Sequence, residues 1–202
     1  MKEVILNKNN RLQVLQEAMS IIREGGVIVY PTETSYGLGA DFYNDQAVNK
    51  VYQIKDRDKE HKLSVLVPDL DSAKTIVHFP GEARRLAEHH WPGALTFILP
   101  FRNCTWPDHC SDYLALRVSS HAFAKELIQA HGGPIIATSA NISGQEDCYH
   151  PEQIQKQFAN KKHQPDLFIN AGELKQNKPS TIIKFIDNKA EILRQGDLKI
   201  KI

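Results

Sequence analysis

A buried strand that runs into a cluster of hydroxyl groups is the feature of this sequence that most constrains its fold. Residues 27–29, VIV, are apolar and β-branched, a pattern typical of a buried strand. Pro31 cannot donate a ladder hydrogen bond, so we expect the strand to end there. The hydroxyl-rich residues that follow lead to Gly37 and Gly39, which allow a positive φ or the close approach of a ligand.

Two interpretations of residues 30–39 (YPTETSYGLG) stay open from the residues alone. A strand that runs into hydroxyls and glycines is typical of a ligand site at a strand end in an α/β protein. An ordinary polar turn with a capping threonine would contain the same residue types.

Length and composition predict one compact domain over residues 1–202, because 202 residues with 41% hydrophobic content can bury a sizeable core. A formal net charge of +1 argues against attachment to nucleic acid by total charge, although it allows a local basic groove. Three cysteines and an N-terminus without an apolar signal favour the reducing cytoplasm. No run approaches the ~20 apolar residues of a membrane span, so we expect no membrane partner.

Helical and strand patterns alternate along most of the chain, which predicts the α/β class. Helices are expected over residues 11–23, 45–54, 71–77, 81–90, 122–130 and 151–158. Strands are expected over residues 4–6, 27–30, 63–67, 95–99, 114–118, 167–170 and 179–186, and from residue 134. Asn44 or Asp45 is expected to cap the second helix, and Asp71 or Ser72 the third. The strand-rich last third favours a mixed parallel and antiparallel sheet.

The charged run of residues 55–62, KDRDKEHK, lies directly before an expected strand. One interpretation is a solvated loop whose charges neutralise one another. The other is a phosphate-handling loop, in which the alternating lysine and arginine side chains point the same way.

A single arginine, Arg117, stands inside the apolar run LALRV of residues 114–118. Because an unpaired buried charge is costly, this guanidinium needs a partner. The partner is either an acidic side chain in a structural salt bridge or the carboxylate or phosphate of a ligand. Arg194 is a second lone arginine, close to Gly196.

Two further strands meet hydroxyl groups, in the segments PIIATSANISG (134–144) and PSTIIKFI (179–186). Cys104, His109 and Cys110 share a loop, but their spacing fits no zinc pattern, so no metal site built from protein side chains is expected. The sequence also lacks a G-x-S-x-G elbow, a Walker A loop and a G-x-G-x-x-G fingerprint. Separated cations and three hydroxyl-rich strand ends favour a nucleotide-using synthase or transferase that acts by positioning and charge neutralisation.

Seven short strings, in order along the chain, resemble the YrdC/TsaC family of threonylcarbamoyl-AMP synthases. They are PTETSYGLGA from Pro31, KDR from Lys55, HWPGALTFIL from His90, LALRV from Leu114, TSANISG from Thr138, PSTII from Pro179 and ILRQG from Ile192. The resemblance covers about residues 11–196 and is to the short, single-domain branch. It implies a YrdC-like α/β fold: a twisted mixed sheet with flanking helices and a concave, positively charged surface.

The resemblance also implies a function, that of a cytoplasmic nucleotidyltransferase, L-threonylcarbamoyladenylate synthase. Such an enzyme condenses L-threonine, bicarbonate and ATP to threonylcarbamoyl-AMP and pyrophosphate. Mg²⁺ would bind together with ATP by bridging phosphate oxygens. Partner transferase proteins would then move the threonylcarbamoyl group to tRNA, which places the chain in tRNA modification.

The resemblance implies a role for each matching position. The threonine pocket would be lined by Thr32, Tyr36, Arg117, Ala137 and Ser180, with Arg117 on the substrate carboxylate. The K-x-R and S-x-N residues would hold the ATP phosphates and form the catalytic set; they are Lys55, Arg57, Ser139 and Asn141. Arg194 would also serve the nucleotide.

The 55–62 loop departs from the family pattern at three positions. Asp58 replaces a proline, His61 stands where the family has a lysine, and Lys62 replaces a second proline. We therefore expect His61 or Lys62 to take over the phosphate contact of that lysine. Two alternatives stay open: a paralogue of the same fold with another acceptor, and a non-catalytic RNA-binding module.

Overall fold

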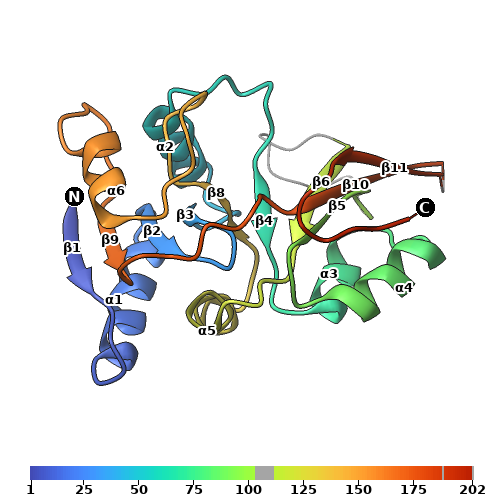
Figure 1. Ribbon diagram of the computed structural model, residues 1–202, viewed down its shortest axis with the longest axis horizontal. Helices are drawn as coiled ribbons and strands as arrows, with labels where there is room; N and C mark the ends of the chain where they lie inside the picture. The colour runs from blue at the N-terminus through green and yellow to red at the C-terminus, as the bar shows by residue number, and fades with distance from the viewer. Residues whose placement is uncertain (103–111, 188, 202) are drawn as a thin grey trace.

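The computed structural model describes residues 1–102, 112–187 and 189–201 and divides their strands between two mixed sheets (Figure 1). The first sheet has the order β1-β9-β2-β3-β8, formed by Lys2–Ile5, Leu167–Asn170, Ile28–Pro31, Tyr36–Gly39 and Thr138–Ser139. The second has the order β11-β10-β5-β6-β4-β7, formed by Lys189–Arg194, Thr181–Ile186, Leu95–Pro100, Tyr113–Arg117, Ser64–Leu66 and Ile135–Ile136. Each sheet contains parallel and antiparallel pairs, so the predicted mixed α/β architecture is confirmed.

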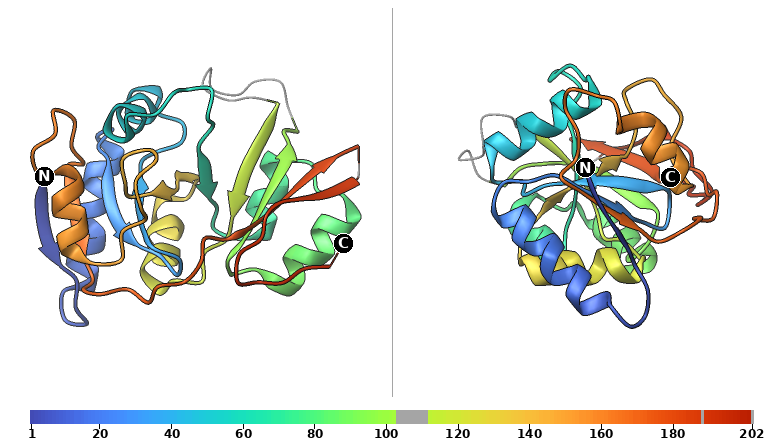
Figure 2. Two further views of the ribbon diagram at one scale, coloured as in Figure 1. Left: turned by 45° about the horizontal axis from the view of Figure 1, so that its top comes forward. Right: turned by 90° about the vertical axis from the view of Figure 1, so that its left-hand side faces the viewer.

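Six helices flank these sheets in the described ranges: α1 (Arg11–Arg23), α2 (Asp45–Lys55), α3 (Leu70–Ile76), α4 (Gly81–His90), α5 (Ala122–His131) and α6 (Pro151–Phe158). One core cluster joins α1 and α5 to β2 and β9. The other joins α2 and α6 to the first sheet and α3 and α4 to the second. The three pairs, α1 with α5, α2 with α6 and α3 with α4, therefore lie over different parts of the two sheets, as Figures 1 and 2 show.

Local sequence explains where several helices begin and end. The buried side chains of α1 recur at helical spacing, and Gly25, with a φ of 79°, follows its last turn. Asn44 caps α2 as predicted, since its side chain accepts a hydrogen bond from the backbone N–H of Ala47 at 3.0 Å. The predicted cap of α3 was wrong by two residues or more. The cap is Asp69, which accepts from the Ser72 N–H at 2.7 Å, because the helix begins at Leu70.

Residues 36–39 form a strand that the sequence did not predict. This strand, β3, pairs antiparallel with β2, and Tyr30 lies opposite Gly37. The turn between the two strands is closed by the Thr32 hydroxyl, which donates to the Ser35 carbonyl at 2.7 Å and accepts from the N–H groups of Thr34 and Ser35. The hydroxyl-rich stretch is therefore the turn and second strand of a hairpin.

Gly39 is required by the packing of this hairpin. A Cβ atom at Gly39 would lie 2.8 Å from Cε1 of the Tyr30 ring, and one at Gly37 would lie 3.5 Å from the same atom. The close approach that these glycines permit is thus that of the buried Tyr30 ring to the backbone of β3.

The strand expected from residue 134 is divided between the two sheets. β7 pairs with β4 of the second sheet, whereas β8 pairs with β3 of the first, and only Ala137 separates them. We call residues 134–141 the crossing segment. This segment carries the S-x-N residues to the junction of the sheets.

Cys104, His109 and Cys110 lie outside the described residues. Within the described ranges, no helix combines the length and the apolar character needed to cross a membrane.

We predict that Gly39→Ala lowers the free energy of unfolding by about 1–3 kcal/mol, because the new methyl group overlaps a fully buried aromatic ring. Gly81→Ala is the matched control. Gly81 begins α4 with no atom within 4 Å of the new Cβ, so its replacement should leave stability unchanged or raise it by up to about 1 kcal/mol. Urea unfolding of both variants measures this; equal effects would contradict the packing role of Gly39.

Candidate functional site

A pocket of about 310 Å³ lies where the two sheets meet. Its walls come from the β2–β3 hairpin, β4, β5, β6, the crossing segment, the start of β10 and the end of β11. Hydroxyl groups are frequent in the lining, which includes Thr32, Thr34, Ser35, Ser64, Thr96, Thr138, Ser139 and Ser180. The three hydroxyl-rich strand ends predicted from the sequence thus converge on one cavity.

Nine of the twelve predicted site residues line this pocket: Thr32, Tyr36, Arg57, Lys62, Arg117, Ala137, Ser139, Ser180 and Arg194. The other three, Lys55, His61 and Asn141, are not part of the lining. Lys55 and Asn141 are buried behind the pocket wall, whereas His61 is exposed on its loop.

Arg117, at the end of β6, forms a buried ion pair. Its Nη1 atom donates to Oε1 of Glu33 at 2.6 Å, and the two side chains are only 10% and 15% exposed. The structural salt bridge that the sequence left open therefore exists. Arg117 also lines the pocket, so recognition of a ligand anion is compatible with the same placement.

Lys55, the last residue of α2, uses its three ammonium hydrogens inside the protein. Its Nζ atom lies 2.6 Å from the Ser139 carbonyl oxygen, 2.9 Å from the Asn141 carbonyl oxygen and 2.9 Å from Asn141 Oδ1. Burial, with a smaller contribution from the charge of Arg57, lowers the pKa of Lys55 to about 7. Lys55 thus fixes the S-x-N turn.

The S-x-N turn is also held from within. The Ser139 hydroxyl donates to Asn141 Oδ1 at 2.7 Å, and the Asn141 amide donates to the Gln145 carbonyl. The N–H of Ser143 donates to the Lys55 carbonyl at 2.8 Å. This network leaves the Ser139 side chain at the pocket and the Asn141 side chain behind it.

Arg57 shapes the 55–62 loop. Its Nε and Nη2 atoms donate to the carbonyl oxygens of His61 and Lys62 at 2.9 and 3.1 Å. These bonds bend the loop around the guanidinium while both Arg57 and Lys62 line the pocket. Of the two candidates to replace the family lysine, Lys62 is the one at the pocket.

Arg194 and Ser180 form another part of the wall. Arg194 donates to the carbonyl and hydroxyl oxygens of Ser180 at 3.0 and 3.2 Å, and the Ser180 hydroxyl lies 2.8 Å from that of Thr96. The guanidinium is thereby fixed in the pocket lining by Ser180 of the PSTII string.

Tyr36 binds backbone rather than solvent through its hydroxyl group. The hydroxyl donates to the Gly172 carbonyl at 2.6 Å and accepts from the Ala171 N–H at 3.0 Å. Burial raises the pKa of Tyr36 to about 12, so the hydroxyl stays neutral near pH 7. Tyr36 is therefore a fixed part of the pocket lining.

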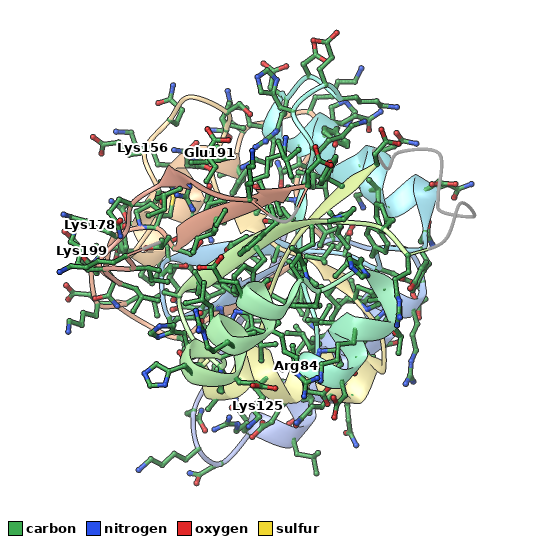
Figure 3. The ribbon with its side chains drawn as sticks, turned by 90° about the vertical axis from the view of Figure 1, so that its right-hand side faces the viewer. Arg84, Lys125, Lys156, Lys178, Glu191 and Lys199 are labelled. Atoms are coloured by element: carbon green, nitrogen blue, oxygen red, sulfur yellow. The ribbon has the colours of Figure 1, made fainter. Side chains whose placement is uncertain are left out.

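Sequence reasoning missed two acidic residues at the site. Glu33 pairs with Arg117, and Asp147 lines the pocket among the cationic residues. Glu33 lies in the quoted PTET string, but the string does not show which side chain it meets. Many other charged side chains extend into solvent, as Lys178 does in Figure 3, whereas those of Glu33 and Arg117 are largely buried.

No group of three or more His, Cys, Asp or Glu side chains that could hold a metal ion is found in the part of the chain that the structure describes.

Curated proteins similar to this chain include one from Pyrococcus abyssi and one from Methanocaldococcus jannaschii. A protein of Pyrococcus abyssi named threonylcarbamoyl-AMP synthase is 31% identical over 98% of this chain and 59% of its own length. A Methanocaldococcus jannaschii protein that carries this name provisionally is 33% identical over 97% of this chain and 92% of its own length. The chain thus spans about three fifths of one relative and nearly all of the other.

This chain is also similar to a solved structure and matches a family model. The crystal structure of P. abyssi Sua5 complexed with L-threonine has a TM-score of 0.86 and 30% identity over 98% of this chain and 57% of that chain. The Sua5/YciO/YrdC family model, whose description is "Telomere recombination", matches residues 20–196. Because this match covers most of the chain, the chain belongs to the Sua5/YciO/YrdC family.

Proposed function

We propose that this protein is a threonylcarbamoyl-AMP synthase, which joins L-threonine, bicarbonate and ATP and releases pyrophosphate. One observation carries the proposal. A single hydroxyl-lined pocket brings together a buried arginine, suited to a carboxylate, and three further cationic residues, suited to phosphates: Arg57, Lys62 and Arg194. The names of the two curated relatives and the threonine in the P. abyssi Sua5 crystal support the same substrates.

Threonine would bind on the Arg117 side of the pocket. The planar guanidinium suits a carboxylate, and its burial strengthens the charge-assisted hydrogen bonds. The remaining wall would be formed by Thr32, Tyr36, Ala137 and Ser180, which all line the pocket. The Thr32 and Tyr36 oxygens already hold backbone groups, so these residues would supply mainly shape.

ATP would bind on the side of Arg57, Lys62 and Arg194. In the proposed reaction, threonine and bicarbonate first form a carbamate and release water. A carbamate oxygen then attacks the α-phosphorus of ATP, the bond from that phosphorus to the bridging oxygen breaks, and pyrophosphate leaves. Two anions must meet in this step, so fixed cations lower their repulsion and stabilise the charge on the leaving group.

Mg²⁺ would arrive with ATP and take most of its ligands from phosphate oxygens and water, as this ion usually does in nucleotide sites. Asp147 contributes a carboxylate to the pocket lining. Among the described lining residues, it is the side chain that would best suit contact with such an ion. The ion would neutralise phosphate charge, while Arg57 and Lys62 position the phosphates.

The product would serve tRNA modification in the cytoplasm. Threonylcarbamoyl-AMP is a mixed anhydride, so a partner transferase would have to carry its acyl group to a tRNA adenosine. We include tRNA and these transferases among the partners.

The test of the proposal is pyrophosphate release from ATP and Mg²⁺, with threonine and bicarbonate each present or omitted. We expect release only when both are present, because the carbamate is the attacking group. Release without threonine, or no release in any mixture, would contradict the synthase and favour a paralogue with another acceptor.

We predict that Arg117→Lys raises the KM for threonine roughly 10- to 100-fold, because lysine keeps the positive charge but loses the planar pair of donors. The KM for ATP should change little, since the proposal assigns Arg117 to threonine. Steady-state kinetics with each substrate varied in turn measures both values. Equal increases in the two KM values would contradict the assigned role.

We predict that Lys55→Met lowers kcat at least about 100-fold with a smaller effect on the KM for ATP, because the S-x-N turn loses three hydrogen bonds. The buried acceptors left behind should also lower stability by about 1–3 kcal/mol. Lys59→Met, on the exposed part of the same loop, is the control and should leave both unchanged. A normal kcat in Lys55→Met would remove the turn from the mechanism.

A further inference from the structure

The ion pair between Glu33 and Arg117 is part of a larger arrangement. Oε1 of Glu33 accepts from Arg117 Nη1 at 2.6 Å, and the other oxygen, Oε2, accepts from the hydroxyl group of Ser119. Both carboxylate oxygens are thus engaged, and the hydroxyl of Ser119, two residues after Arg117, fixes the carboxylate independently of the guanidinium.

The backbone around Glu33 is held as firmly as its side chain. The carbonyl oxygen of Glu33 accepts from the Asn177 amide at 2.8 Å. On either side, the Thr32 hydroxyl binds the backbone of Thr34 and Ser35, which closes the hairpin turn. Glu33 is therefore a rigid anion presented to the end of β6.

The guanidinium of Arg117 keeps donors to spare. Arginine has five N–H groups in a planar fork, and one of them is used by Glu33. Among the residues that the structure describes, the Arg117 side chain meets no second acceptor. Because Arg117 also lines the pocket, its other donors are available to an anion there.

We propose that Glu33 is a positioning residue for substrate binding: it holds one nitrogen of Arg117 so that the remaining donors face the carboxylate of the amino-acid substrate. The inference rests on the proposed function and deepens it. A long side chain free to rotate would have to be ordered when substrate arrives, at a cost in entropy. Glu33 meets this cost during folding.

The pairing also makes recognition of the substrate depend on hydrogen-bond geometry. Glu33 and Arg117 together carry almost no net charge, so the substrate carboxylate gains little from long-range attraction at this point. Its affinity would come from directed N–H donors held in the correct plane. Loss of orientation should therefore weaken threonine binding even though a positive charge remains.

A competing role for Glu33 would give the opposite result. If its carboxylate occupied the place of the substrate carboxylate, removal of Glu33 would strengthen threonine binding. The bonds from Ser119 and Asn177 to Glu33 argue against such displacement, because Glu33 would have to break contacts that are separate from Arg117.

The test compares Glu33→Ala and Glu33→Gln in the full chain, with Glu88→Ala as control. Glu88 accepts from Arg84 Nε at 2.8 Å on the surface of α4, so its loss removes a Glu–Arg pair outside the pocket lining. Threonine affinity is measured by titration calorimetry, and the KM values for threonine and ATP by pyrophosphate release.

We expect Glu33→Ala to weaken threonine binding at least about tenfold and to change the KM for ATP less than about twofold. Glu33→Gln, which still offers an oxygen to Arg117, should stay within about threefold of the wild type. Ser119→Ala, a milder change for the case in which Glu33→Ala does not fold, should raise the KM for threonine about three- to tenfold. Glu88→Ala should match the wild type.

Unchanged or tighter threonine binding in Glu33→Ala would overturn the inference, as would equal losses for threonine and ATP. If Glu33→Ala does not fold, an unchanged KM for threonine in Ser119→Ala would do the same. Failure of the wild type to bind threonine would overturn the proposed function and the inference together, which separates the two cases.

Discussion

The crossing segment, and the hydrogen bonds that fix it, is the feature on which the rest of the structure depends. The N–H of Ala137 donates to the Ser64 carbonyl of β4, and the Ser64 hydroxyl donates back to the Ala137 carbonyl. Three residues later, the Ala140 N–H donates to the Tyr36 carbonyl of β3. One short segment thus joins the two sheets, and the pocket lies at this joint.

Lys55 explains why the joint holds its shape. Strands of two residues provide few ladder hydrogen bonds, so β7 and β8 would be weak by themselves. The ammonium group of Lys55 adds three hydrogen bonds at the end of β8, from a helix more than eighty residues earlier in the chain. Burial lowers the pKa of Lys55. The hydrogen bonds to three acceptor oxygens favour the ammonium form and orient the side chain.

Much of the fold could be predicted from the sequence because local residue patterns determine where these elements begin and end. The bounds of α1, α4, α6 and β9 follow from apolar spacing, prolines and glycines and agree with the structure. β3 could not be predicted, because its two glycines are typical of a loop. Their role in the strand depends on the packing of the Tyr30 ring against them, which the sequence does not show. The division of residues 134–139 between two sheets could not be predicted either, since pairing partners distant in sequence decide it.

The candidate site shows the same limit. Motif strings indicated most of the residues that line the pocket, including Arg117, Ser180 and Arg194. The strings could not show that Lys55 lies outside the pocket lining and binds the S-x-N turn, because a K-x-R string is the same whether its lysine meets a phosphate or a carbonyl oxygen. Buried hydrogen-bond partners are a property of the folded chain, and no local pattern encodes them.

Arg117 illustrates how one residue can combine an observed structural role with a proposed functional one. A buried guanidinium without a partner is too costly to keep, so the fold needs Glu33 beside it. A guanidinium with every donor used would be useless to a ligand. A single bond to Glu33 meets both conditions, since it offsets the charge and leaves the other donors of this pocket-lining residue unused by the described side chains. The salt bridge and the proposed ligand-binding role of Arg117, alternatives in the sequence, are therefore compatible in one arrangement.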